Sequence, residues 1–164
     1  EQMAAFIHRT LSYLDGSYTP PEEPPAEDPD DQAEYNQMVA DILKLTNAER
    51  STAGLPKLKM HDEAQELAMI KAKDMYVNSY FDHTSPVYGS PFDMMDEAGL
   101  QYRTAGENIA AGYQSAEAVV NGWMNSPGHR ANILNPEFTH LGVGYFKTDG
   151  GYAHYYVQMF ITPR

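Results

Sequence analysis

The sequence predicts an α+β protein in which helices precede a terminal antiparallel hairpin. Apolar residues recur at helical spacing (i, i+3, i+4, i+7) over residues 32–53 and again over residues 62–78. Near the C-terminus, residues 141–146 and 152–161 read as two strands around a turn at residues 148–151. Helices followed by an antiparallel hairpin favour a small sheet that is covered by helices.

Capping residues predict where the other helices begin and end. Asp62 is the expected N-cap of the second helix, and Ser115 that of a helix over residues 116–125. Ser126 and Pro127 are expected to cap and open a short last helix that reaches residue 134. The residues between are expected to form a short helix from Pro91 to Gly99 and a strand or loop at residues 102–113.

The amino-acid composition argues against two classes of binding partner, nucleic acids and membranes. The 164 residues include 23 acidic and 11 basic side chains, which gives a net charge of −12. A chain this acidic lacks the basic surface that binds nucleic-acid phosphates or anionic lipid. No apolar run approaches the roughly 20 residues that span a bilayer, and the absence of cysteine excludes disulfides and thiolate metal sites. We therefore expect no nucleic-acid partner and no membrane span in this chain.

Proline and charge divide the chain into three parts. Residues 1–15 place apolar side chains at helical spacing and predict a short amphipathic helix, which we expect to contact another domain or subunit. Residues 16–33 combine prolines with acidic side chains, which is typical of an extended linker. Residues 34–164 form the main domain. Because the chain begins with Glu1 and not with methionine, we also expect that a signal or anchor has been removed.

Three polar segments lie between apolar ones and carry His83, Glu107 and His129. His129 follows Gly128 in the first turn of a predicted helix, where the helix dipole favours a neutral imidazole that can bind a metal. Two neutral histidines and a carboxylate suit a divalent ion with open coordination positions. The same three side chains also suit a hydrogen-bonded cluster that joins three segments, so both interpretations stay open.

A serine nucleophile or a glycosidase pair has less support. No G-x-S-x-G motif is present, and Ser85 and Ser126 each precede a proline, where turn or cap roles account for them. Cleavage of a glycoside needs a second acid near Glu107, and the spacing places none there. Among the other histidines, His154 is expected to be hydrogen-bonded within the sheet.

Several motifs together resemble one known family. They are His-Thr-Ser-Pro at 83–86, Gly-Glu-Asn-Ile-Ala at 106–110, the segment 120–130 around the tryptophan, and the closing strands at 141–145 and 156–160. This set resembles the CAP superfamily, also called the SCP domain, which comprises cysteine-rich secretory proteins, antigen 5 and plant pathogenesis-related proteins. The match is closest to its bacterial, cysteine-free branch.

The resemblance implies an α-β-α sandwich, with a central antiparallel sheet between helical layers. It also implies a cavity lined by two histidines and two acids, which in some members binds zinc or another divalent cation. His83 and His129 match the two histidines, and Glu107 matches the acid of the Gly-Glu-Asn motif. The second acid usually follows the tryptophan by three positions, where this chain has Ser126. One anionic ligand of a hard cation is therefore missing.

Members of the superfamily are mostly secreted and differ in function, so the resemblance implies no single reaction. We expect a secreted or cell-surface bacterial module with a binding or structural role and a cleft formed by His83, His129 and Glu107. Its ligand is unassigned, and the candidate classes are a lipid, a peptide and a cell-wall component. The alternative is a metal-dependent hydrolase that acts on a peptide or cell-wall substrate with the same three residues. At this point an enzyme and a non-catalytic module both remain open.

Overall fold

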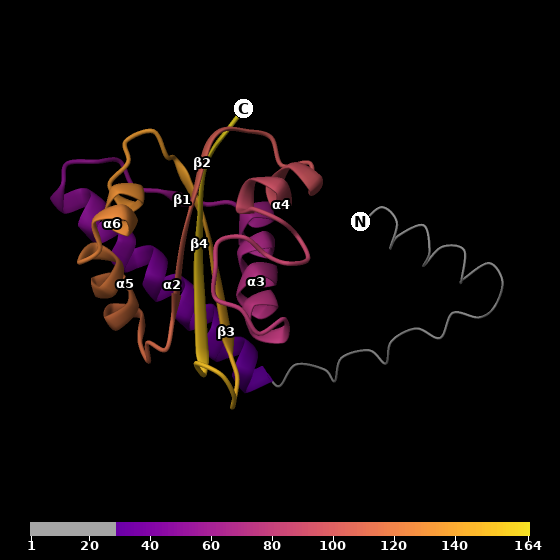
Figure 1. The fold of residues 1–164 in the computed structure, drawn as a ribbon. Coiled ribbons are helices and arrows are strands. Elements are labelled where there is room, and N and C mark those ends of the chain that lie inside the picture. Colours follow the sequence, from indigo (N-terminus) through magenta and orange to yellow (C-terminus); the bar gives the residue numbers. More distant parts are fainter. Residues whose placement is uncertain (1–28) are drawn as a thin grey trace. The chain divides into compact units, whose positions relative to one another are not determined.

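The computed structural model describes residues 29–164 (Figure 1). Residues 1–28, which include the predicted N-terminal helix and most of the predicted linker, lie outside the described residues. Helix α2 (Pro29–Thr52) confirms the first predicted helix but begins earlier, so residues 29–33 at the end of the predicted linker are helical. Proline suits the first turn of a helix because the N–H that it lacks has no partner there.

A four-stranded sheet has the strand order β1-β3-β4-β2. The predicted hairpin is present as β3 (His140–Lys147) and β4 (His154–Pro163). Strand β2 (Tyr102–Ala111) pairs antiparallel with β4 and forms one edge, so this segment is a strand and not a loop. At the other edge, β1 (Lys59–Met60) pairs with β3 in parallel over two residues.

Helices cover both faces of this sheet, as the predicted sandwich requires (Figure 1). One face carries α3 (Asp62–Val77) and α4 (Pro91–Glu97), which share an apolar core with the strands. The other face carries α2, α5 (Ala116–Met124) and α6 (Pro127–Ile133), with Trp123 in the second core. The predicted α-β-α fold class is therefore confirmed.

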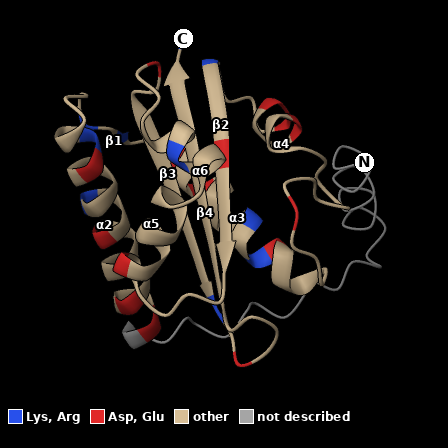
Figure 2. Cartoon of the chain, turned by 60° about the vertical axis from the view of Figure 1, so that its left-hand side comes forward, with Lys and Arg blue, Asp and Glu red and all other residues tan. Residues whose placement is uncertain are grey.

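Charged residues lie mainly outside the sheet. In Figure 2 the bodies of β3 and β4 carry almost no charged residue, whereas α2 carries acidic and basic residues along its length. The polar groups within the hairpin are paired: His154 Nδ1 lies 2.9 Å from the Tyr145 hydroxyl, which confirms the expected hydrogen-bonded role. Within residues 29–164, no helix combines the length and apolarity that a membrane crossing needs.

Two of the three predicted N-cap residues are at the expected positions, and one is not. The Ser115 hydroxyl caps α5 as predicted and accepts a backbone N–H at 3.1 Å. Helix α3 is capped by His61 and not by Asp62, because the imidazole Nδ1 of His61 accepts the free N–H of the first turn. Ser126 occupies the N-cap position of α6 and Pro127 opens the helix, as predicted, but the Ser126 side chain makes no cap bond. Ser126 also lines a cavity.

Two glycines in β3 let α3 approach the sheet closely. A Cβ added at Gly142 would lie 2.2 Å from the carbonyl group of Ala64, and one at Gly144 would lie 2.0 Å from the carbonyl oxygen of Ala68. Non-bonded heavy atoms need about 3.5 Å, so any side chain would push the helix away. These glycines and the fully buried alanines facing them set the distance between α3 and the sheet.

We expect Gly144→Ala to lower the free energy of unfolding by about 3 kcal/mol, because the clash is with backbone that cannot rotate away. Urea denaturation measures the change. Gly128→Ala is the matched control, because a Cβ there meets nothing within 4 Å. A Gly144→Ala protein as stable as the control would contradict the close packing of α3 on β3.

Candidate functional site

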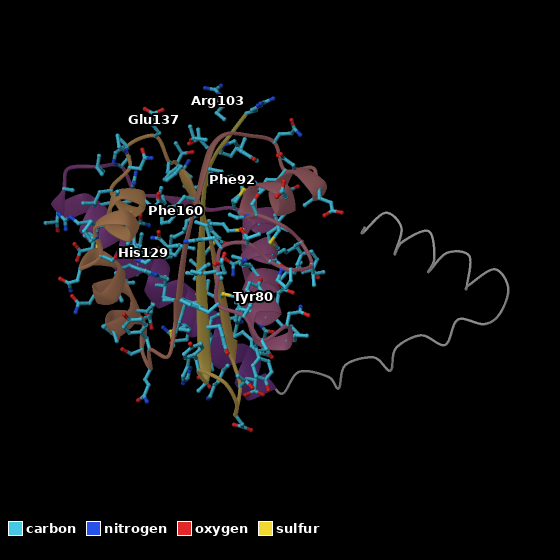
Figure 3. All side chains as sticks on the ribbon, viewed as in Figure 1. Tyr80, Phe92, Arg103, His129, Glu137 and Phe160 are labelled. Carbon is cyan, nitrogen blue, oxygen red and sulfur yellow. The ribbon has the colours of Figure 1, made fainter. Side chains whose placement is uncertain are left out.

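A cavity of about 480 Å³ lies beside β2, the edge strand. One wall is the loop after α3, which contributes Phe81 and His83. The opposite wall comes from α5 and α6, which contribute Trp123, Ser126 and His129. Figure 3 shows His129 on the side of the sheet that α5 and α6 cover. Two of the three predicted site residues, His83 and His129, therefore line one cavity from opposite walls.

The third predicted residue, Glu107 on β2, contacts His83 directly. His83 Nδ1 lies 2.7 Å from Glu107 Oε1, and the Glu107 side chain is 1% exposed whereas that of His83 is 53% exposed. The second carboxylate oxygen, Oε2, is buried and has no hydrogen-bond partner among the described residues. The pair thus joins a buried carboxylate to an imidazole that solvent reaches.

The two histidines differ in their affinity for a proton. The hydrogen bond to Glu107 raises the pKa of His83 above its ordinary value. Burial lowers the pKa of His129, and the nearby charge of His83 lowers it further. The direction for the pKa of His129 is the expected one, and burial is its largest cause. Burial also raises the pKa of Glu107, although His83 and Lys71 oppose this shift. The cavity therefore holds a neutral imidazole opposite a more basic one.

The loop that carries His83 is held by two buried side chains of α3. Lys71, which is 0% exposed, donates from Nζ to the carbonyl oxygen of His83 at 2.6 Å. Asp74 accepts from Ser85 Oγ at 2.6 Å and from the hydroxyl of Tyr80. Sequence reasoning missed both side chains. For Lys71 the sequence does hold a signal of burial, because this charged residue falls on the apolar stripe of the predicted helix.

A chain of amide side chains, of which Asn108 and Gln158 are fully buried, holds the opposite wall. Asn108 Nδ2 on β2 donates to the carbonyl oxygen of His129 and to Gln158 Oε1, both at 3.1 Å. Asn132 on α6 donates to Asn108 Oδ1 at 2.9 Å and to the Glu107 carbonyl oxygen at 3.1 Å. Asn108 thus joins β2 to α6. Asn132 and Gln158 were not predicted.

Arg50 of α2 is a further buried group that the sequence did not reveal. Its guanidinium donates to backbone carbonyl oxygens of Ile133 at 2.9 Å, Asn135 at 2.8 Å and Phe138 at 3.1 Å. These carbonyls lie at and beyond the end of α6, where a helix leaves acceptors without partners. Arg50 therefore holds the end of the helix that presents His129.

The three predicted ligands do not fit a metal ion as they lie. The Nδ1 atom of His83 is already bonded to Glu107. Among residues 29–164, no group of three or more His, Cys, Asp or Glu side chains is placed to hold an ion. Ser126, at the position where the resemblance places a second acid, lines the cavity but adds no charge. In this arrangement Glu107 is the hydrogen-bond partner of His83.

Comparison with known proteins identifies the family. Residues 43–160 match the Cysteine-rich secretory protein family, CAP. This segment is more than half of the chain, so the protein belongs to the CAP family. It has no cysteine, as expected for the bacterial branch that the motifs resemble.

Two relatives come from Bacillus subtilis (strain 168). The uncharacterized protein YkwD is 55% identical over 107 residues, which are 65% of this chain and 42% of YkwD. The uncharacterized membrane protein YlbC is 44% identical over 120 residues, which are 73% of this chain and 33% of YlbC. The matched region thus spans less than half the length of either relative.

Solved structures share the fold. An extracellular protein containing a SCP domain from Bacillus anthracis str. Ames superposes with a TM-score of 0.75 at 38% identity, over 85% of this chain and 45% of that chain. A cysteine-rich secretory protein from Staphylococcus aureus gives a TM-score of 0.63 at 22% identity, over 85% of this chain and 41% of that chain. The second likeness supports the fold alone.

We expect Glu107→Gln to lower the pKa of His83, because the carboxylate that stabilises the imidazolium is lost. An NMR titration of the histidine side chains measures the shift, with His140 on β3 as an internal control. In the native protein, the stabilisation from the pair is fully present below the ordinary histidine pKa of 6.5 and is lost as pH rises through the raised pKa of His83. An unchanged His83 pKa in the variant would show that Glu107 does not control this histidine.

Proposed function

We propose that the protein is an extracellular or cell-surface CAP module that binds a ligand in the cavity between His83 and His129. The observation that carries the proposal is the cavity itself, with an apolar and aromatic lining and a small set of convergent polar groups. Ligand sites in proteins have this composition and comparable size. The extracellular protein from Bacillus anthracis, a relative at 38% identity, supports the location.

The polar groups of the cavity are held in place by the interior of the protein. Lys71 fixes the backbone of His83, and Asn108 fixes the backbone of His129. Ordered supports of this kind reduce the entropy that is lost when a ligand binds. The arrangement therefore favours recognition of a ligand by a preformed surface.

The alternative is a metal-dependent hydrolase that acts on a peptide or cell-wall substrate through His83, His129 and Glu107. It requires zinc or another divalent cation at these residues, and their arrangement does not favour one. We therefore place binding ahead of hydrolysis and derive no catalytic step.

The binding proposal can be tested through Trp123. It is the only tryptophan and lines the cavity, so its indole N–H signal in an NMR spectrum reports on that cavity alone. Three probes represent the proposed ligand classes: lysine-rich octapeptides, oligosaccharides of N-acetylglucosamine, and phosphatidylcholine vesicles. We expect one probe to shift the signal saturably and His129→Ala to weaken its binding about tenfold. Lys44→Ala, on the exposed side of α2, is the control. If no probe moves the signal, the proposed function fails.

The metal alternative has its own test. Calorimetric titration of chelator-treated protein with zinc near pH 7 should show no saturable single site in the micromolar range, because no third ligand joins His83 and Glu107. The control is the double variant His83→Ala, His129→Ala. One-site binding that disappears in this double variant would establish a metal site and favour the hydrolase.

A further inference from the structure

The cavity lies along an unpaired edge of the sheet. Among residues 29–164, strand β2 pairs only with β4, so its other edge faces away from the sheet. The N–H of Gly112, just beyond β2, donates to the His154 carbonyl oxygen at 2.9 Å and so points toward β4. Because backbone groups alternate in direction along a strand, those of Glu107, Ile109 and Ala111 point to the outer edge.

Side chains from α5 and α6 cover part of this outer edge. Trp123 Nε1 donates to the Ile109 carbonyl oxygen at 3.2 Å, and Asn132 Nδ2 donates to that of Glu107 at 3.1 Å. Both bonds confirm the outward direction of these carbonyls. Proteins commonly cover edge strands because free edges pair with other chains. Here the cover stops at Ile109.

The remaining part of the edge is open to the cavity. No side chain in residues 29–164 caps the outward N–H of Ile109, or the outward N–H and C=O of Ala111. Ile109, Ala110 and Ala111 all line the cavity. Residues two apart on a strand lie about 7 Å from each other. The cavity therefore presents donors and an acceptor at the spacing of a second β-strand.

Aromatic side chains flank this open edge. Phe81 and Tyr113 line the cavity and are 44% and 37% exposed. Tyr113 lies against α5 at Gly122, where an added Cβ would come within 2.4 Å of the Tyr113 hydroxyl oxygen. Glycine is unfavourable inside a helix, and here it makes room for the aromatic ring. Such walls can receive the side chains of an extended chain.

The charge of the cavity favours a basic ligand. Asp82 lines it, and neither lysine nor arginine is among the lining side chains of the described residues. The chain as a whole has a net charge of −12, which attracts positively charged partners. Exposed aromatic rings also bind ammonium and guanidinium groups through their faces.

We propose that the outer edge of β2 at Ile109–Ala111 binds an extended, lysine- or arginine-containing peptide segment, which adds to the sheet as a further strand. The inference rests on the proposed function, because it names the ligand class of the same cavity. A polypeptide fits better than a glycan or a lipid because it alone offers alternating N–H and C=O groups at strand spacing.

The test uses the full 164-residue chain, labelled with ¹⁵N, and a set of acetylated and amidated octapeptides. Lysine or arginine occupies every second position, and valine, leucine or tyrosine the positions between. Each peptide is also made in two N-methylated versions, one with the amides of the odd-numbered residues methylated and one with those of the even-numbered residues methylated. The amide signals of Ile109 and Ala111 and their hydrogen-exchange rates are followed during titration.

We expect saturable shifts at both amides and slower exchange by about tenfold at saturation. One of the two N-methylated versions should bind at least about tenfold more weakly, because it lacks the N–H donors that face β2. The other version should bind within about threefold of the unmethylated peptide. Equal binding of the two versions, or no peptide that shifts these amides at millimolar concentration, overturns the inference.

A variant pair checks the aromatic wall. Gly122→Ala displaces the Tyr113 ring and should weaken peptide binding about tenfold. Glu117→Ala, on the exposed side of the same helix, should not change it. Thermal unfolding verifies that both variants are folded. Unchanged binding by folded Gly122→Ala protein overturns the inference as stated.

These outcomes separate the inference from the proposed function. If oligosaccharide or vesicles shift the Trp123 indole signal while no peptide shifts Ile109 and Ala111, the strand-addition inference fails and the binding function stands. If no probe shifts any of the three signals, both fail.

Discussion

The site depends on how closely α3 packs against the sheet. Gly142 and Gly144 lack the side chains that would hold the helix away, and the backbone of Ala64 and Ala68 lies directly against them. If one added carbon atom pushed α3 away from the sheet, every side chain that the helix carries would move with it. Two of these, Lys71 and Asp74, reach from α3 to the loop that bears His83. The close contact between α3 and β3 therefore helps to set the position of the His83 imidazole in the cavity.

Both walls of the cavity follow the same principle, in which buried polar side chains hold backbone. On one side Lys71 and Asp74 bond the loop after α3. On the other, Asn108 bonds the backbone of His129, and Arg50 bonds the end of α6. Removing a partner from such a buried network leaves polar groups without hydrogen bonds, which costs more than the bond contributes. These contacts therefore order the site, and substitution of any of these polar side chains is expected to destabilise the protein.

The fold, and not the residue type alone, sets the environment of Glu107 and its effect on His83. It lies on an edge strand, yet its side chain is 1% exposed because the loop with His83 closes over it. Burial raises the pKa of Glu107 while the carboxylate raises the pKa of His83. The opposite wall keeps His129 less basic. The cavity therefore combines a basic and a neutral imidazole, although the two histidines are chemically identical.

The sequence by itself determined the main helices and the terminal hairpin, because apolar periodicity and turn residues are local signals. The α-β-α class came from the resemblance of its motifs to the CAP superfamily. His83, Glu107 and His129 were found in this way. Their supports were not. Lys71, Asp74, Asn132 and Arg50 bond to residues far along the chain or in another element, and no local pattern encodes such partners. Only the tertiary structure decided that His83 pairs with Glu107, because the distances between segments depend on packing.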